Sequence, residues 1–129
     1  MQMQMPQEIE VWFILPALRR ELAKSMIADH RLSQKQVAGI MGITEAAVSQ
    51  YLKSKRAKDV KFSKQTVAEI KTAAKNIVTD NTHMMSELLH LCNLSDVKHL
   101  MCKLHKSQFD IDAKCNVCFE GDLIKLTVK

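Results

Sequence analysis

Two short helical patterns separated by one glycine fill residues 32–56, and they restrict the fold of the chain more than any other feature. Ser33 is followed three residues later by Gln36, a capping-box pair that is typical of the first turn of a helix. Gly42 comes after the last apolar residue of that pattern, and glycine ends helices because it adopts the left-handed backbone conformation at little cost. The sequence therefore predicts a helix over residues 33–41 with a tight turn behind it.

A second short helix is predicted directly after the turn. Thr44 is a suitable N-cap for residues 45–53, and Val48 and Leu52 give that helix an apolar side. The side chains that remain outside are Glu45, Ala46, Ser49, Gln50 and Lys53. Two apolar-faced helices joined by a glycine turn are the pattern of a helix-turn-helix, whose second helix lies in the major groove of DNA.

The outer side chains of the second helix have the chemistry that base recognition requires. Gln50 can pair with adenine, Ala46 can contact a thymine methyl group, and Glu45 can accept a hydrogen bond from cytosine. Gln34 and Lys35 stand at the start of the first helix, where side chains and free backbone amides can hold a phosphate. We therefore expect the second helix to read bases and the first helix to hold the DNA backbone.

A basic run continues behind the second helix. Against one acidic residue, Asp59, it holds six basic residues, namely Lys53, Lys55, Arg56, Lys58, Lys61 and Lys64. The excess equals the formal net charge of the whole chain, +5 at pH 7, and such a concentration of cations suits phosphate contacts and counterion release. The alternative is a capped helical pair of an ordinary helical protein, with the lysines on a solvated face. The agreement among caps, turn glycine, helix faces and charge favours DNA binding.

The rest of the chain is also predicted to be mainly helical, because only three glycines and two prolines interrupt 129 residues. Apolar residues recur at helical spacing in three further stretches. The expected helices cover residues 16–30, 63–79 and, as one helix or two, 82–104. Behind them we expect a loop and a short strand over residues 123–128.

The first of these helices separates charged from apolar residues. Arg19, Arg20 and Lys24 fall outside the apolar stripe of residues 16–30, so we expect them on the other faces of the helix. The preceding residues 7–15 are too apolar for a solvated tail. They either extend the helix through a kink or form a separate apolar arm, which core packing or a dimer contact would hide.

All four cysteines lie in the last third of the chain, at Cys92, Cys102, Cys115 and Cys118. The last two form a CxxC pair, and in a reduced compartment such clustering indicates a metal site rather than disulfides. Four thiolates suffice for a zinc ion or for an iron-sulfur cluster. His105 could take the place of Cys92 in a zinc site, and four ordinary thiols are the alternative to any metal.

Several classes of protein are not expected from this sequence. The longest apolar run, residues 11–18, is far shorter than the roughly 20 residues that cross a bilayer, so no membrane span is expected. The N-terminus shows no secretory pattern, which favours the cytoplasm and reduced thiols. No glycine-rich phosphate loop and no nucleophile–base pair stands out, so we do not expect an enzyme.

The segments ILPALRRELAK and LSQKQVAGIMGITEAAVSQYLKSKR together resemble a family of small archaeal predicted transcriptional regulators with an Xre-type helix-turn-helix and a C-terminal cysteine-rich module. The resemblance implies that Gln34 clamps the DNA backbone. The positions that it implies for base reading are Glu45, Ala46, Ser49 and Gln50. It also implies a cysteine pair, then CxxH, then a closing CxxC, whereas Ser95 here occupies the second position of the first pair.

These patterns together predict two parts. Residues 1–80 would form an Xre-like helical bundle with the helix-turn-helix, and residues 81–129 a helical, cysteine-rich module for metal binding or dimerisation. The predicted function is a sequence-specific DNA-binding transcriptional regulator that works as a homodimer, with zinc or an iron-sulfur cluster that stabilises the module or senses redox state or metal. The alternative is a redox or metal-handling protein whose helical domain binds a protein partner.

Overall fold

The computed structural model describes residues 5–53 and 60–108, and within these two stretches the regular structure is helical, with no strand. Its elements are α1 (Pro6–Ile9), the π-helical turn η1 (Glu10–Ile14), α2 (Leu15–His30), α3 (Gln34–Met41), α4 (Glu45–Lys53), α6 (Lys64–Thr79), the 3-10 turn η2 (Asn81–His83), α7 (Met84–Cys92) and α8 (Ser95–Gln108). The predicted helices are confirmed, although α8 continues past the expected end at residue 104. The strand expected over residues 123–128 lies outside the described residues.

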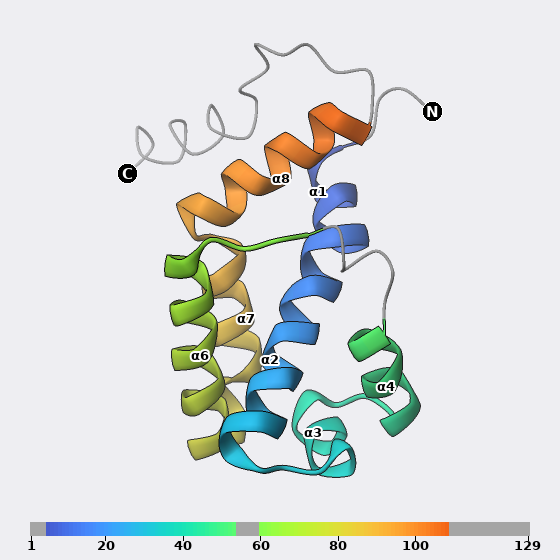
Figure 1. Ribbon diagram of the computed structural model, residues 1–129, viewed down its shortest axis with the longest axis vertical. Helices are drawn as coiled ribbons and strands as arrows, with labels where there is room; N and C mark the ends of the chain where they lie inside the picture. The colour runs from blue at the N-terminus through green and yellow to red at the C-terminus, as the bar shows by residue number, and fades with distance from the viewer. Residues whose placement is uncertain (1–4, 54–59, 109–129) are drawn as a thin grey trace.

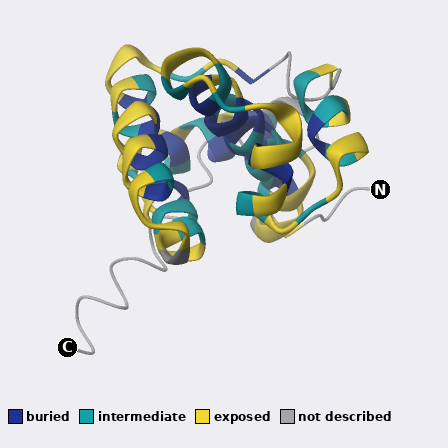
Figure 2. Ribbon diagram, turned by 90° about the horizontal axis from the view of Figure 1, so that it is seen from below, coloured by how far each residue is buried: buried dark blue, intermediate teal, exposed yellow. Residues whose placement is uncertain are grey.

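Helix α2 is the centre of the fold (Figure 1). Helices α6 and α7 lie along one side of it, the α3–α4 pair lies on the other side, and α8 crosses the end near α1. Leu18, Leu22 and Met26 of α2 are fully buried, and the inner faces of the surrounding helices are buried with them, as Figure 2 shows. The same hydrophobic core includes, from α7 and α8, Leu91, Val97, Met101 and Leu104.

The ends of α3 and the start of α4 have the caps that the sequence predicts. The Ser33 hydroxyl accepts a hydrogen bond from the Gln36 backbone amide at 3.1 Å, and the Gln36 side chain accepts one from the Ser33 amide at 2.8 Å. Gly42 ends α3 in the left-handed conformation, with φ of 70°. The Thr44 hydroxyl accepts from the Ala47 amide at 3.0 Å. These local contacts satisfy backbone donors that the helix ends would otherwise leave unpaired.

The N-terminal residues continue directly into α2 through the π-helical turn η1, rather than forming a separate arm. Pro16 explains the wider turn, because its ring crowds the carbonyl group four residues before it and it has no N–H to donate. The amide of Leu15 instead donates to the Glu10 carbonyl group. Ile14 is buried in the core, whereas the Trp12 side chain is 52% exposed. Core packing therefore covers only part of this apolar segment.

Arg20 departs from its expected place on an outer face of α2. Only 9% of this residue is exposed, and its Nη2 atom donates to the Val60 carbonyl oxygen at 3.4 Å. The carboxylate of Glu21 lies 3.7 Å from Nε. The long side chain can be buried because its head finds a backbone acceptor on a distant segment, which helical periodicity cannot reveal.

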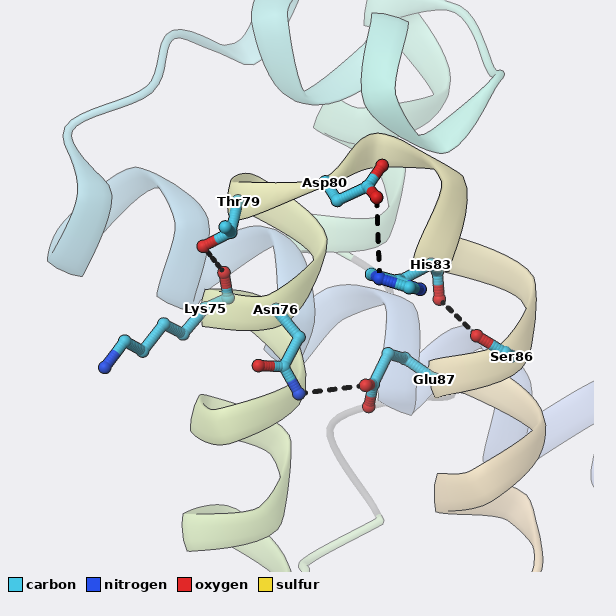
Figure 3. A network of polar contacts seen from close by, with 7 residues as sticks. All are labelled: Lys75, Asn76, Thr79, Asp80, His83, Ser86 and Glu87. Carbon is cyan, nitrogen blue, oxygen red and sulfur yellow. Dashed lines mark hydrogen bonds and ion pairs between the residues drawn. The ribbon is translucent and has the colours of Figure 1, made fainter.

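Polar side chains join α6 to α7 around η2 (Figure 3). Asn76 donates to the Glu87 carboxylate at 2.9 Å, and the His83 ring lies 3.6 Å from the Asp80 carboxylate. Ser63, the N-cap of α6, also hydrogen-bonds to Asp96 of α8 at 3.0 Å. In the two described stretches, no helix combines the length and the apolar character needed to cross a bilayer.

Candidate nucleic-acid interface

Helices α3 and α4 pack against each other and against α2, with Gly42 in the turn between them. Val37 of α3 and Val48 of α4 are fully buried and belong to the core around α2. A Cβ atom added at Gly42 would meet no atom within 4 Å, so the backbone angle rather than crowding selects glycine here. The pair therefore has a fixed turn and a common buried side.

One side of α4 carries the side chains that the sequence assigns to base reading, together with Lys53, the first residue of the basic run. Successive residues of a helix point about 100° apart, which groups Glu45, Ala46, Ser49, Gln50 and Lys53 on one side. Glu45, Ala46, Gln50 and Lys53 are exposed, whereas Ser49 is half-buried. Carboxylate, methyl, amide and ammonium groups thus lie together on the outer side of a short helix, within the range of chemistry that base edges recognise.

The opposite side of α4 is held against α2 by apolar and polar contacts. Val48 is fully buried and Leu52 is half-buried. The Arg19 Nη1 atom donates to the Tyr51 hydroxyl oxygen at 3.4 Å, and the guanidinium carbon lies 5.8 Å from the centre of the Tyr51 ring. Sequence reasoning missed this contact, because spacing assigns Tyr51 to the inner side of α4 without identifying its partner.

The two residues expected to hold phosphate lie in the first turn of α3. The capping box uses the backbone amides of Ser33 and Gln36, so those of Gln34 and Lys35 are not part of it. The side chains of Gln34 and Lys35 are exposed. A helix start with amides outside the capping box and a nearby cation is suited to an anion.

The structure separates the two ends of the basic run, Lys53 and Lys64. Lys53 is exposed at the end of α4, while Lys55, Arg56 and Lys58 lie outside the described residues. The chain then crosses to the start of α6, on the other side of α2 (Figure 1). Lys64, the first residue of α6, is therefore separated from the α3–α4 pair by the central helix. Charge summed along the sequence overstates the charge that gathers beside α4.

Two of the four cysteines lie within the described residues. Cys92 ends α7 and is buried, and this burial, together with the nearby Glu10 carboxylate, raises the pKa of its thiol from 9.0 to about 11, although the Arg19 charge opposes the shift. With no metal bound, the neutral thiol is thus favoured at Cys92. Arg19 is therefore close enough to influence α7 as well as α4.

Cys102 and His105 lie three residues apart on α8 and are both buried. Residues at this spacing share a face of a helix, so the pair fits two positions of a zinc site. Cys115 and Cys118, the remaining predicted ligands, lie outside the described residues. Within residues 5–53 and 60–108, no three histidine, cysteine or acidic side chains gather as metal ligands would.

Comparison of the chain with protein-family models, with curated proteins and with solved structures yields no match.

Proposed function

We propose that this protein is a sequence-specific DNA-binding transcriptional regulator in which α3 and α4 act as a helix-turn-helix of the Xre type. The observation that carries the proposal is the two-sided character of α4. Its outer side exposes Glu45, Ala46, Gln50 and Lys53, while its inner side is held through Val48 and Tyr51. A short helix whose inner side packs against the protein and whose outer side exposes compact polar groups is suited to the major groove.

Within this proposal the two helices have separate tasks. The outer side of α4 reads base edges, with Gln50 as the adenine-pairing residue and the half-buried Ser49 as a second contributor. Phosphates are contacted at the start of α3 by Gln34 and Lys35 and at the end of α4 by Lys53. Because Lys55 and Arg56 follow Lys53 in the sequence, they are assigned to phosphate contacts as well. Phosphate contacts supply affinity and orientation, and base contacts supply specificity.

A selection from a random duplex library tests the proposal, because no operator need be known beforehand. The purified full chain should enrich a defined motif, and its affinity for the selected duplex should fall steeply with salt concentration. Gln50→Ala should weaken binding to the selected duplex by about 1–3 kcal/mol while barely changing binding to a scrambled duplex. Lys53→Ala should weaken both duplexes alike and lower the salt slope by about one.

Lys64→Ala is the matched control for Lys53→Ala. It removes the same charge from the far side of α2 and should leave both affinities close to those of the wild type. No enrichment of any motif, and no duplex binding at low salt, would overturn the proposal in favour of a metal-handling protein with a protein partner.

We propose that the regulator binds DNA as a homodimer, since single helix-turn-helix units gain affinity and palindromic specificity by two-fold pairing. Large apolar side chains with more than half of their surface exposed occur in the N-terminal segment and on α7, at Met5, Val11, Trp12, Met85 and Leu89. These positions favour α7 and the N-terminal segment over the lysine-bearing side of α6 as the contact with a second copy.

We further propose a zinc or iron-sulfur site in the C-terminal part of the chain. The buried pair on α8 favours Cys102, His105, Cys115 and Cys118 as the ligands, because Cys102 and His105 lie three residues apart on one helix, and Cys92 in place of His105 is the alternative. Metal analysis of anaerobically purified protein tests this choice. Cys102→Ser should lose the metal, and Cys92→Ser should retain it. Equal loss in both variants would instead favour a site with four cysteines.

A further inference from the structure

The only tyrosine of the chain contacts an arginine of the central helix. Arg19 and Tyr51 are 32 positions apart, yet the guanidinium group reaches the phenol oxygen at 3.4 Å and lies 5.8 Å from the ring centre. Both residues are half-buried, so water screens the contact only in part. The contact lies on the side of α4 away from Gln50 and Lys53.

Apolar packing and an N-cap also hold α4. Val48 and Leu52 supply apolar packing, which is less directional than a hydrogen bond. The Thr44 cap fixes only the first turn. The guanidinium–phenol contact is directional and acts in the last turn, where Lys53 also lies.

We propose that Arg19 is a positioning residue for base reading: through Tyr51 it fixes the rotation of the last turns of α4 against α2, and so the direction in which Gln50 points. The inference rests on the proposed function and adds a residue that does not itself touch DNA. Gln50 precedes Tyr51 in the chain, so a rotation that moves the ring moves the amide by the same angle.

Arg19→Gln, Arg19→Lys and Tyr51→Phe test the inference, with Lys24→Gln as a control that removes the same charge from an exposed position of α2. Affinities are measured for the library-selected duplex and for a scrambled duplex of the same composition. Arg19→Gln should lower the ratio of the two affinities at least tenfold, while binding to the scrambled duplex changes less than twofold. Lys24→Gln should leave the ratio unchanged.

Further measurements separate positioning from loss of fold. Selective tyrosine labelling yields one set of ring resonances, from Tyr51, which should shift in Arg19→Gln and stay in place in Lys24→Gln, with the helical circular dichroism of both variants unchanged. Arg19→Lys, which keeps the charge without the planar fork, should recover at most part of the affinity ratio. The double variant Arg19→Gln, Tyr51→Phe should be no worse than Arg19→Gln alone.

An unchanged affinity ratio in Arg19→Gln, or additive losses in the double variant, would overturn the inference alone. If the wild-type protein enriches no duplex, the proposed function fails and the inference fails with it. The two failures are therefore distinguished by the wild-type measurement.

Discussion

The Arg20 guanidinium group donates from Nη2 to the Val60 carbonyl oxygen at 3.4 Å, and both residues are buried although 40 positions separate them. Nε of the same group finds no hydrogen-bond acceptor within the described part of the chain, and Glu21 approaches it only to 3.7 Å. A buried charge with an incompletely satisfied atom contributes less net stability than a well-paired one. Much of the stability that Arg20 contributes should therefore come from the packing of its apolar stem.

Replacing Arg20 by methionine should consequently cost less than replacing it by alanine. Arg20→Met retains the packed stem and removes the unsatisfied donor, so we expect a loss within about 1 kcal/mol in the free energy of unfolding. Arg20→Ala leaves a cavity and should lose about 2–4 kcal/mol. Urea unfolding followed by circular dichroism measures both values. Equal losses would show that the hydrogen bond to Val60 dominates, and Lys24→Ala serves as the exposed control.

Two glycines of the α3 segment should respond to alanine in opposite directions. Gly39 lies inside α3 with open space around its missing Cβ, so Gly39→Ala should raise the free energy of unfolding by about 0.5–1 kcal/mol through helix propensity. A Cβ at Gly42 would also meet open space, but φ there is +70°, so Gly42→Ala should lower the free energy of unfolding by about 1–2 kcal/mol. Thermal unfolding of the two variants provides the comparison, and destabilisation by Gly39→Ala would contradict it.

The contrast between caps and long-range contacts explains how much of this structure the sequence predicts. Ser33 and Gln36 are three residues apart, and Gly42 acts through its own backbone, so local patterns suffice to predict the ends of α3. Arg19 and Arg20 meet their partners only after α2 packs against distant segments. Periodicity shows that a residue lies outside the apolar stripe, but it does not show which group will cover it.

The candidate site also has one part that local patterns predict and one part that depends on the packing of distant segments. The outer side of α4 follows from helical spacing, so the sequence predicts its residues, with Ser49 less exposed than expected. The basic run is less predictable, because the chain crosses α2 before α6 begins and so separates Lys64 from Lys53. Residues that are close in sequence share a surface only when no element lies between them.

Glu45 should limit binding to unrelated DNA. Its exposed carboxylate lies in the first turn of α4, where a DNA phosphate would repel it and a base amino group, such as that of cytosine, would pair with it. Glu45→Gln should therefore strengthen binding to a scrambled duplex several-fold and reduce discrimination at one position of the selected motif. Competition binding at two salt concentrations measures both effects. A uniform loss of affinity for both duplexes would contradict this role.

Leu89 should contribute to the contact between two copies of the chain. Leu89 and Met85 are four residues apart on α7, so they share a face, and their exposed fractions are 58% and 75%. Leu89→Glu would place a charge in that contact and should raise the dimer dissociation constant at least tenfold in sedimentation equilibrium. Gln65→Glu introduces the same charge on the exposed surface of α6 and should leave the dissociation constant unchanged.

The Cys92 thiol should react slowly with alkylating reagents in the folded, chelator-treated protein. Its pKa is raised from 9.0 to about 11, first by burial and then by Glu10, so little thiolate forms near pH 8. Iodoacetamide labelling of the Cys92 peptide, read by mass spectrometry, should be slow until urea unfolds the chain. Arg19→Gln removes a charge that lowers this pKa and should slow labelling further.

The same shift sets the sign of a pH effect on stability. A thiol whose pKa is raised on folding, here from 9.0 to about 11, favours the folded state while it is protonated, so its contribution is present below pH 9.0 and is lost as the pH rises toward 11. Cys92→Ala removes this titration, so the wild-type protein should lose more stability than Cys92→Ala between these pH values. Parallel stability curves would place Cys92 in contact with water or with another cation.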